Sequence, residues 1–140
     1  DHRDLHLSLR RQRQMCIRDS IHSVGDVMRV IVSRGIEDLT IVTSKIHSAL
    51  EEIRRISSMV RVELGGYMGN EPLEHELKKI KDLKADILSP HVSIVNEEMV
   101  RKAHSQGIDV HVWDVNDLPS IEKAKRISVD GITSDYPDRV

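Results

Sequence analysis

The sequence has little aromatic character and almost no cysteine. Phe is absent, aromatic residues make up 2% of the 140 residues, and Cys16 is the single cysteine. The core must therefore be built from Ile, Val, Leu and Met. One cysteine excludes an internal disulfide and a cysteine-based zinc site.

Long apolar runs and a strong excess of charge are also missing. Apolar runs are short, as around Val30 to Val32, and none approaches the ~18 residues of a membrane span. No apolar signal region follows the basic stretch near the start. The formal net charge of -2 is too weak to indicate nucleic-acid binding. We therefore expect one soluble globular domain without a transmembrane segment or a nucleic-acid partner.

The first twenty residues differ from the rest of the chain. They show no sustained periodicity. Read back into codons, Asp1–His6 and Arg10–Asp19 resemble the adapter and transposase-end DNA used to prepare short-read sequencing libraries. We therefore interpret residues 1–20 as translated adapter sequence outside the domain, with a basic amino-terminal arm as the alternative. Cys16 then carries no redox information, and residues 21–140 hold 16 basic and 20 acidic residues.

Residues 21–140 repeat one strand-like run at a regular spacing. Runs rich in β-branched residues begin 21 to 25 residues apart, near Thr40, Arg61, Asp86, Asp109 and Gly131. Such runs are typical of strands, and their mostly apolar character suits a sheet that is covered by helices.

Helical segments lie between these runs. We predict helices over 26–34 and 72–83, a capping box at Ser48 to Glu51, and helices that begin after Asn96 and Asp117. The alternation implies parallel strands joined by right-handed βα connections. Its period suits a (β/α)8 TIM barrel, and five strands are too few to close one. We therefore predict a partial (β/α)8 TIM barrel of α/β class, with a flavodoxin-like open sheet as the alternative.

The last third of the chain carries several characteristic segments. Val110–Asn116 reads VHVWDVN and is similar to a V-x-V-W-T-V-N strand, and Asp130–Pro137 reads DGITSDYP and is similar to D-G-I-I-T-D-Y-P. Ala103-His104 with Gly107 looks like a helix end, and Ile41–Ser44 resembles an I-S-S-F strand. Together these segments resemble the carboxyl-terminal part of the glycerophosphodiester phosphodiesterase family, over about residues 24–140.

The resemblance implies that the chain supplies about the last five βα units of a barrel. It implies a small-molecule glycerophosphodiester substrate, cleaved to glycerol 3-phosphate and an alcohol such as choline or ethanolamine. It also implies a divalent metal, Mg or Ca, in the full-length protein. The family's H-R-G, E-x-D, H-D and E-x-K motifs have no counterpart from Ile21 onward. We therefore expect the catalytic residues upstream, no metal bound by this chain, and no activity of the chain alone.

Trp113 and Lys45 are the candidate substrate-binding residues. His111 and Trp113 lie two positions apart and share a strand face, with Trp113 nearer the carboxyl end, where such barrels place their sites. The resemblance implies that Trp113 forms an apolar wall against the alcohol group; filling the barrel core is the alternative. Lys45 follows Ser44 at a strand end and could reach a phosphate oxygen, or it could be a solvated loop residue. It stands where the family commonly has Phe.

Other polar residues are assigned structural roles. We expect a hydrogen-bonded core position for His111, an ion pair for Glu63, and surface or helix-end positions for His91 and His104. The glycines that begin at Gly65 could cradle a phosphate through backbone N–H groups, although a glycine turn alone is weak evidence. No group of carboxylates has the spacing of a metal site.

Two functions therefore stay open. The first is the carboxyl-terminal part of a metal-dependent phosphoric diester hydrolase. The alternative is a non-catalytic α/β module that binds a phosphorylated ligand or partner. An incomplete barrel leaves two open sheet edges and exposes apolar strand faces, so we also expect poor solubility or self-association. The sequence assigns no compartment, and the cytoplasm is the favoured expectation.

Overall fold

The computed structural model describes residues 21–140, which form a sheet of five parallel strands. The strands are β1 (Ile41–Ser44), β2 (Arg61–Tyr67), β3 (Ile87–Pro90), β4 (Asp109–Val112) and β5 (Gly131–Ile132). They lie in space in the order of the sequence, each parallel to its neighbour. This arrangement confirms the predicted partial barrel. It excludes the flavodoxin-like alternative, whose first strand lies inside the sheet.

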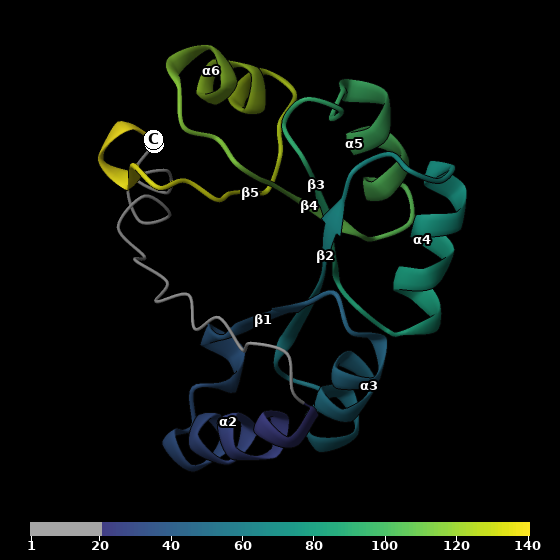
Figure 1. Cartoon of the computed structure of the whole chain (residues 1–140), viewed down its shortest axis with the longest axis vertical. Coiled ribbons are helices and arrows are strands. Elements are labelled where there is room, and N and C mark those ends of the chain that lie inside the picture. Colours follow the sequence, from purple (N-terminus) through teal and green to yellow (C-terminus); the bar gives the residue numbers. More distant parts are fainter. Residues whose placement is uncertain (1–20) are drawn as a thin grey trace.

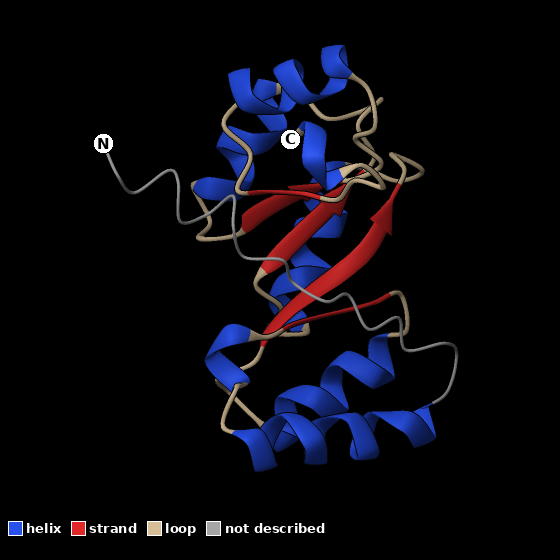
Figure 2. Ribbon diagram, turned by 90° about the vertical axis from the view of Figure 1, so that its left-hand side faces the viewer, coloured by secondary structure: helices blue, strands red, loops and turns tan. Residues whose placement is uncertain are grey.

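The helices cover one face of this sheet. They are α2 (Ile21–Arg34), α3 (His47–Ile56), α4 (Leu73–Asp82), α5 (Glu97–His104) and α6 (Leu118–Arg126), with short 3-10 helices η1 (Glu37–Leu39) and η2 (Pro137–Arg139). The helices form an arc around strands that line its inner side (Figure 1), and the strands lie side by side as a curled half-barrel (Figure 2). Within residues 21–140 no helix combines the length and the apolar character needed to cross a membrane.

Two predicted helix caps are confirmed and one is wrong. The Asn96 side chain accepts the backbone N–H of Met99 at 2.9 Å, and Asp117 caps α6 in the same way through Ser120. The predicted capping box at Ser48 does not form, because α3 already begins at His47. Ser44 Oγ accepts the backbone N–H of Ile46 at 3.0 Å, and this local turn starts the helix early.

Alternation along the strands directs one set of apolar side chains against the helices. These strand residues are at most 6% exposed and join helix residues in one buried cluster: Val42, Val62, Leu64, Leu88, Val110 and Val112, with Leu50, Ile53, Leu77, Ile80, Val100 and Ala103. A one-residue slip of any strand would turn this set away from the helices, so the cluster fixes the strand register.

The inner face of the sheet carries polar pairs. Arg61 Nη2 lies 2.5 Å from Asp109 Oδ2, and His111 Nδ1 lies 3.0 Å from Glu63 Oε2. Both contacts link β2 to β4 across β3, where the inward Ile87 is fully buried. The expectation of exposed apolar strand faces is therefore wrong for this face, because alternate residues of β2 and β4 are charged or titratable and satisfy one another. β1 and β5 are the two sheet edges, as predicted.

Candidate substrate site at the carboxyl ends of the strands

Four neighbouring strands bring a lysine, a glycine, a histidine and a tryptophan to one end of the sheet. Lys45 follows β1, Gly66 lies in the last part of β2, His91 follows β3 and Trp113 follows β4. Because the strands are parallel, their carboxyl ends meet at one rim, which is where barrels of this type place their sites. We call Lys45, Gly66, His91 and Trp113 the carboxyl rim.

Trp113 is fixed at this rim by hydrogen bonds to β3 and the residues after it. Its Nε1–H donates to the carbonyl of Ser89 at 2.9 Å, and its own carbonyl accepts the N–H of Val92 at 2.6 Å. The half-buried side chain lies outside the apolar cluster under the helices. Trp113 thus stands at the carboxyl end of its strand, as the spacing predicts, and its contact with a substrate stays a prediction.

Lys45 reaches Trp113 by crossing the end of β2. A Cβ atom on Gly66 would lie 2.3 Å from Lys45 Cε and 2.8 Å from Nζ, and Gly66 has φ +87°. The positive φ favours glycine there, and a Cβ would force the flexible end of Lys45 to move. Lys45 Nζ lies 5.8 Å from the centroid of the Trp113 ring, within cation–π range. The lysine stem therefore occupies the space above Gly66 that the suggested phosphate cradle would need.

His91 is the residue that sequence reasoning missed. We expected a surface position, but the ring is half-buried and packs edge-on against Trp113, with centroids 4.8 Å apart. His91 Nδ1 accepts the backbone N–H of Ser93 at 3.2 Å and lies 2.7 Å from Ser93 Oγ. A neutral His91 ring therefore carries its proton on Nε2, which has no hydrogen-bond partner in residues 21–140. The available signal was its place directly after a strand.

His111 and Glu63 lie deeper on the inner face. Their side chains are 15% and 8% exposed, in line with the structural roles expected of them. The His111 ring fits because residue 131 is glycine: a Cβ there would lie 2.5 Å from His111 Cδ2. His104 ends α5, as expected, with Nε2 2.7 Å from Asp130 Oδ2.

The loop after β2 is held by a compact charged cluster. Tyr67 donates its hydroxyl to the Glu71 carbonyl at 2.7 Å, and Lys79 pairs with the Glu71 carboxylate. The hydrogen bond from Lys79 holds the pKa of Glu71 below its usual value. Burial raises the pKa of Glu76, whose carboxylate lies 3.4 Å from Lys79 Nζ. The two carboxylates share the one ammonium group of Lys79, which holds the loop after β2 against α4, so we assign this cluster a structural role.

A hollow of about 370 Å³ lies at the opposite end of the strands. Residues at the ends of α3 and α4 line it: Glu51, Arg54, Arg55, Ser58, Asp82, Leu83 and Lys84. Arg54 is the least exposed cation of this hollow, and its guanidinium is already paired with Asp86 and with backbone carbonyls. We therefore assign this end a structural role.

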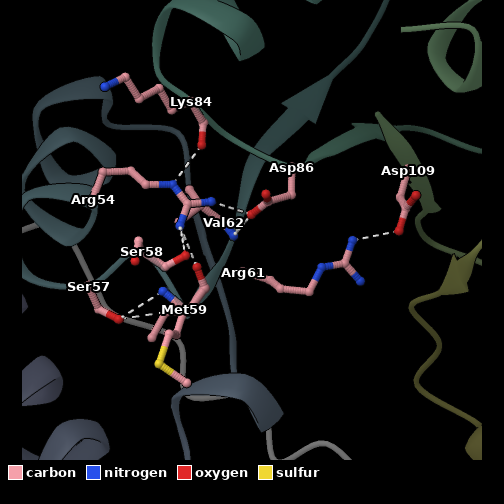
Figure 3. Close-up of polar contacts among 10 residues, drawn as sticks. Arg54, Ser57, Ser58, Met59, Arg61, Val62, Lys84, Asp86 and Asp109 are labelled. Atoms are coloured by element: carbon pink, nitrogen blue, oxygen red, sulfur yellow. Dashed lines mark hydrogen bonds and ion pairs between the residues drawn. The ribbon is translucent and has the colours of Figure 1, made fainter. Parts of the chain in front are cut away.

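Arg54 links α3 to the amino-terminal ends of β2 and β3 (Figure 3). Its guanidinium donates to the carbonyls of Lys84 and Val60, each at 2.6 Å, and pairs with Asp86. Asp86 Oδ2 also accepts the backbone N–H of Val62 at 2.7 Å. The side chain of Arg54 is only 13% exposed, so these contacts satisfy a nearly buried charge.

The described residues do not fit the divalent metal that the resemblance implies. Among residues 21–140 no three His, Cys, Asp or Glu side chains gather so that they could hold a metal ion. A hard cation needs several oxygen ligands that converge on one point. Glu63, the buried carboxylate of the inner face, is instead bonded to His111.

Solved structures share the fold. The chain aligns with a Silicibacter pomeroyi protein described as a glycerophosphoryl diester phosphodiesterase, at 24% identity and TM-score 0.74 over 85% of this chain and 42% of that one. It aligns with an Oleispira antarctica phosphodiesterase in complex with sn-glycerol-3-phosphate, at 18% identity and TM-score 0.73 over 85% and 47%. It also aligns with a Thermotoga maritima glycerophosphodiester phosphodiesterase, at 18% identity and TM-score 0.68 over 86% of this chain and 52% of that one. The chain thus spans about half the length of these relatives.

Sequence comparison assigns the family. No significant match is found among curated protein sequences. The model of the glycerophosphoryl diester phosphodiesterase family matches residues 10–139. The match begins inside segment 1–20, which lies outside the described residues, so its interpretation as adapter sequence stays a prediction. Because the match covers nearly the whole chain, this protein belongs to the glycerophosphoryl diester phosphodiesterase family.

Proposed function

We propose that the chain takes part in the hydrolysis of glycerophosphodiesters to glycerol 3-phosphate and an alcohol. The family match over residues 10–139 is the observation that carries this proposal. The glycerol 3-phosphate named with the Oleispira antarctica structure supports it. The family match also favours a hydrolase over the alternative of a non-catalytic phosphate-binding module.

The chain's own contribution is the carboxyl rim. Trp113 presents an anchored apolar ring for the alcohol part of the diester, and Lys45 brings an ammonium group for a phosphate oxygen. An ammonium group is a suitable partner for phosphate because it offers a point charge and several donors. These two residues bind and orient the substrate without transferring a proton.

The remaining chemistry needs groups that the described residues do not supply. Cleavage of a phosphodiester requires neutralisation of phosphoryl charge, a base or nucleophile, and an acid for the leaving alkoxide. A divalent metal such as Mg or Ca, as in the family resemblance, would supply the first of these. Among residues 21–140 no three His, Cys, Asp or Glu side chains gather so that they could hold this metal. We therefore propose that the chain alone binds substrate weakly and does not hydrolyse it.

An activity assay tests this proposal. The purified 140-residue chain is incubated with Mg²⁺ or Ca²⁺ and glycerophosphocholine or glycerophosphoglycerol, and release of glycerol 3-phosphate is measured. We expect none above the blank. Sustained release that requires the metal would refute the proposed inactivity. The coding sequence upstream of Ile21 then separates the two functions: H-R-G, E-x-D and E-x-K motifs in frame select the hydrolase, and a natural start near Ile21 selects the module.

We also propose that the chain associates with itself through its sheet edges. β1 and β5 end the sheet and present strand backbone that no other strand of residues 21–140 pairs. Sedimentation velocity at several protein concentrations tests this, and we expect the mean mass to rise with concentration. A single monomeric species over the whole range would contradict it.

A further inference from the structure

We propose that Lys45 and Trp113 form a subsite that accepts uncharged or anionic oxygen-rich groups and rejects quaternary ammonium groups. The Trp113 ring receives the alcohol part of the diester, and Lys45 lies beside both the ring and the phosphate that this alcohol esterifies, so the subsite rests on the proposed function.

The Lys45 ammonium already lies over the face of the Trp113 ring. Aromatic faces attract quaternary ammonium groups, which is how many proteins bind choline. Here Lys45 Nζ lies 5.8 Å from the ring centroid, and its stem is placed by passage over Gly66. Within residues 21–140 no carboxylate lies in ion-pair distance of Lys45, so its charge is not neutralised there. A second cation at the ring would meet a like charge, and because Lys45 is exposed this repulsion is strongest at low ionic strength.

The other neighbour of the ring is also a hydrogen-bond donor. His91 packs edge-on against Trp113, and its Nδ1 is used by the Ser93 backbone. A neutral His91 ring therefore carries its proton on Nε2, and this N–H can donate to a ligand. The Lys45 ammonium and the His91 N–H can both donate hydrogen bonds to oxygen acceptors. A glycerol-like or anionic alcohol provides such acceptors, whereas a trimethylammonium group has none.

Gly66 is the specificity determinant in the backbone. Any side chain there would collide with Lys45, since a Cβ would lie 2.3 Å from its Cε. Gly66→Ala should therefore displace the ammonium from the ring while the lysine is still present. Gly69 is the matched control: it also has positive φ, +73°, but a Cβ there would meet only Ile94, at 3.5 Å.

Collisional quenching of Trp113 fluorescence in the full chain tests the charge at the ring without any substrate. The ratio of iodide to caesium quenching should be about threefold higher in the wild type than in Lys45→Gln, at low ionic strength. Lys45→Arg and Gly69→Ala should keep the wild-type ratio, as should Lys78→Gln, which removes a distant charge of α4. Gly66→Ala should lower it. Equal ratios in the wild type, Lys45→Gln and Gly66→Ala would overturn the proposal; circular dichroism verifies that the variants fold.

Fluorescence titration with two diesters tests the subsite as part of the substrate site. The wild type should bind glycerophosphoglycerol more tightly than glycerophosphocholine, and Lys45→Gln should reduce this preference about threefold. A preference that is unchanged in Lys45→Gln would overturn the proposal. Lys45-dependent iodide quenching without binding of either diester would uphold the charge discrimination at Trp113 and refute the proposed function instead.

Discussion

The two ends of the strands use polar residues in opposite ways. At the amino-terminal end, Arg54 and Asp86 satisfy each other and the surrounding backbone, and Arg61 pairs with Asp109. At the carboxyl rim, Lys45 and His91 keep donors that have no acceptor in residues 21–140. Satisfied charges stabilise a fold, whereas donors without partners are available to a ligand. The difference separates the end that holds the half-barrel together from the end that can bind.

The largest effect should follow from breaking the amino-terminal network. Arg54→Ala removes several charge-assisted hydrogen bonds and leaves Asp86 and two carbonyls without their donor. We expect the free energy of unfolding to fall by about 3 kcal/mol, measured by urea denaturation. The surface pair of Lys78 and Asp82 is the control, since Lys78→Ala should change stability by less than about 0.5 kcal/mol. Similar losses of unfolding free energy in Arg54→Ala and Lys78→Ala would contradict the stabilising role of the amino-terminal network.

A smaller effect should follow from crowding the inner face. Gly131→Ala places a Cβ 2.5 Å from the His111 ring and pushes the imidazole away from Glu63. We expect a loss of about 2 kcal/mol in the free energy of unfolding. Gly25→Ala is the same substitution within α2, where a Cβ meets nothing within 4 Å, and it should stabilise the chain by about 0.5 kcal/mol. A Gly131→Ala variant as stable as the wild type would show that His111 can move away from Glu63 without a loss of stability.

The smallest effect should be a pH dependence in the loop cluster after β2. Burial raises the pKa of Glu76, so the folded chain holds its proton at pH values where the unfolded chain has lost it. Stability from this group therefore falls as pH rises from its ordinary value of 4.5 through the raised value. Glu76→Gln should remove this fall, which urea titrations between pH 4 and 7 would measure.

Glu71→Gln is the control of opposite sign. The pKa of Glu71 is lowered by Lys79, so its ionised form stabilises the fold above pH 4.5, and this stability is lost as pH falls through the lowered value. The variant should lack that acid-side loss. Parallel pH profiles for the wild type and both variants would contradict the two assignments.

Strand order and the starts of α4, α5 and α6 could be predicted from the sequence because they depend on local patterns, whereas the helix predicted from residue 26 begins at Ile21. β-branched runs at regular spacing define the parallel strands, and Asn96 and Asp117 cap helices through contacts only three residues away. The early start of α3 escaped prediction because two serines compete there, and Ser44 turns the chain before Ser48 can cap it.

The site was predictable only in part, for a different reason. The positions of Trp113 and Lys45 at the ends of their strands agree with the sequence analysis, and their contact with a substrate stays a prediction. His91 was missed because its importance comes from packing across strands, and no periodicity records which ring it meets. The polar pairs of the inner face also join residues 48 positions apart, so alternation placed Glu63 and His111 on that face but did not pair them.

The agreement between strand order and sequence order has a consequence for how the chain is made. Each strand joins the sheet beside the one synthesised just before it, and the connecting helix covers that pair. The sheet can therefore grow unit by unit as the chain leaves the ribosome, without waiting for distant segments. At every stage the most recent strand forms one edge of the sheet, so a pause in translation would leave that edge open to pairing with a neighbouring nascent chain.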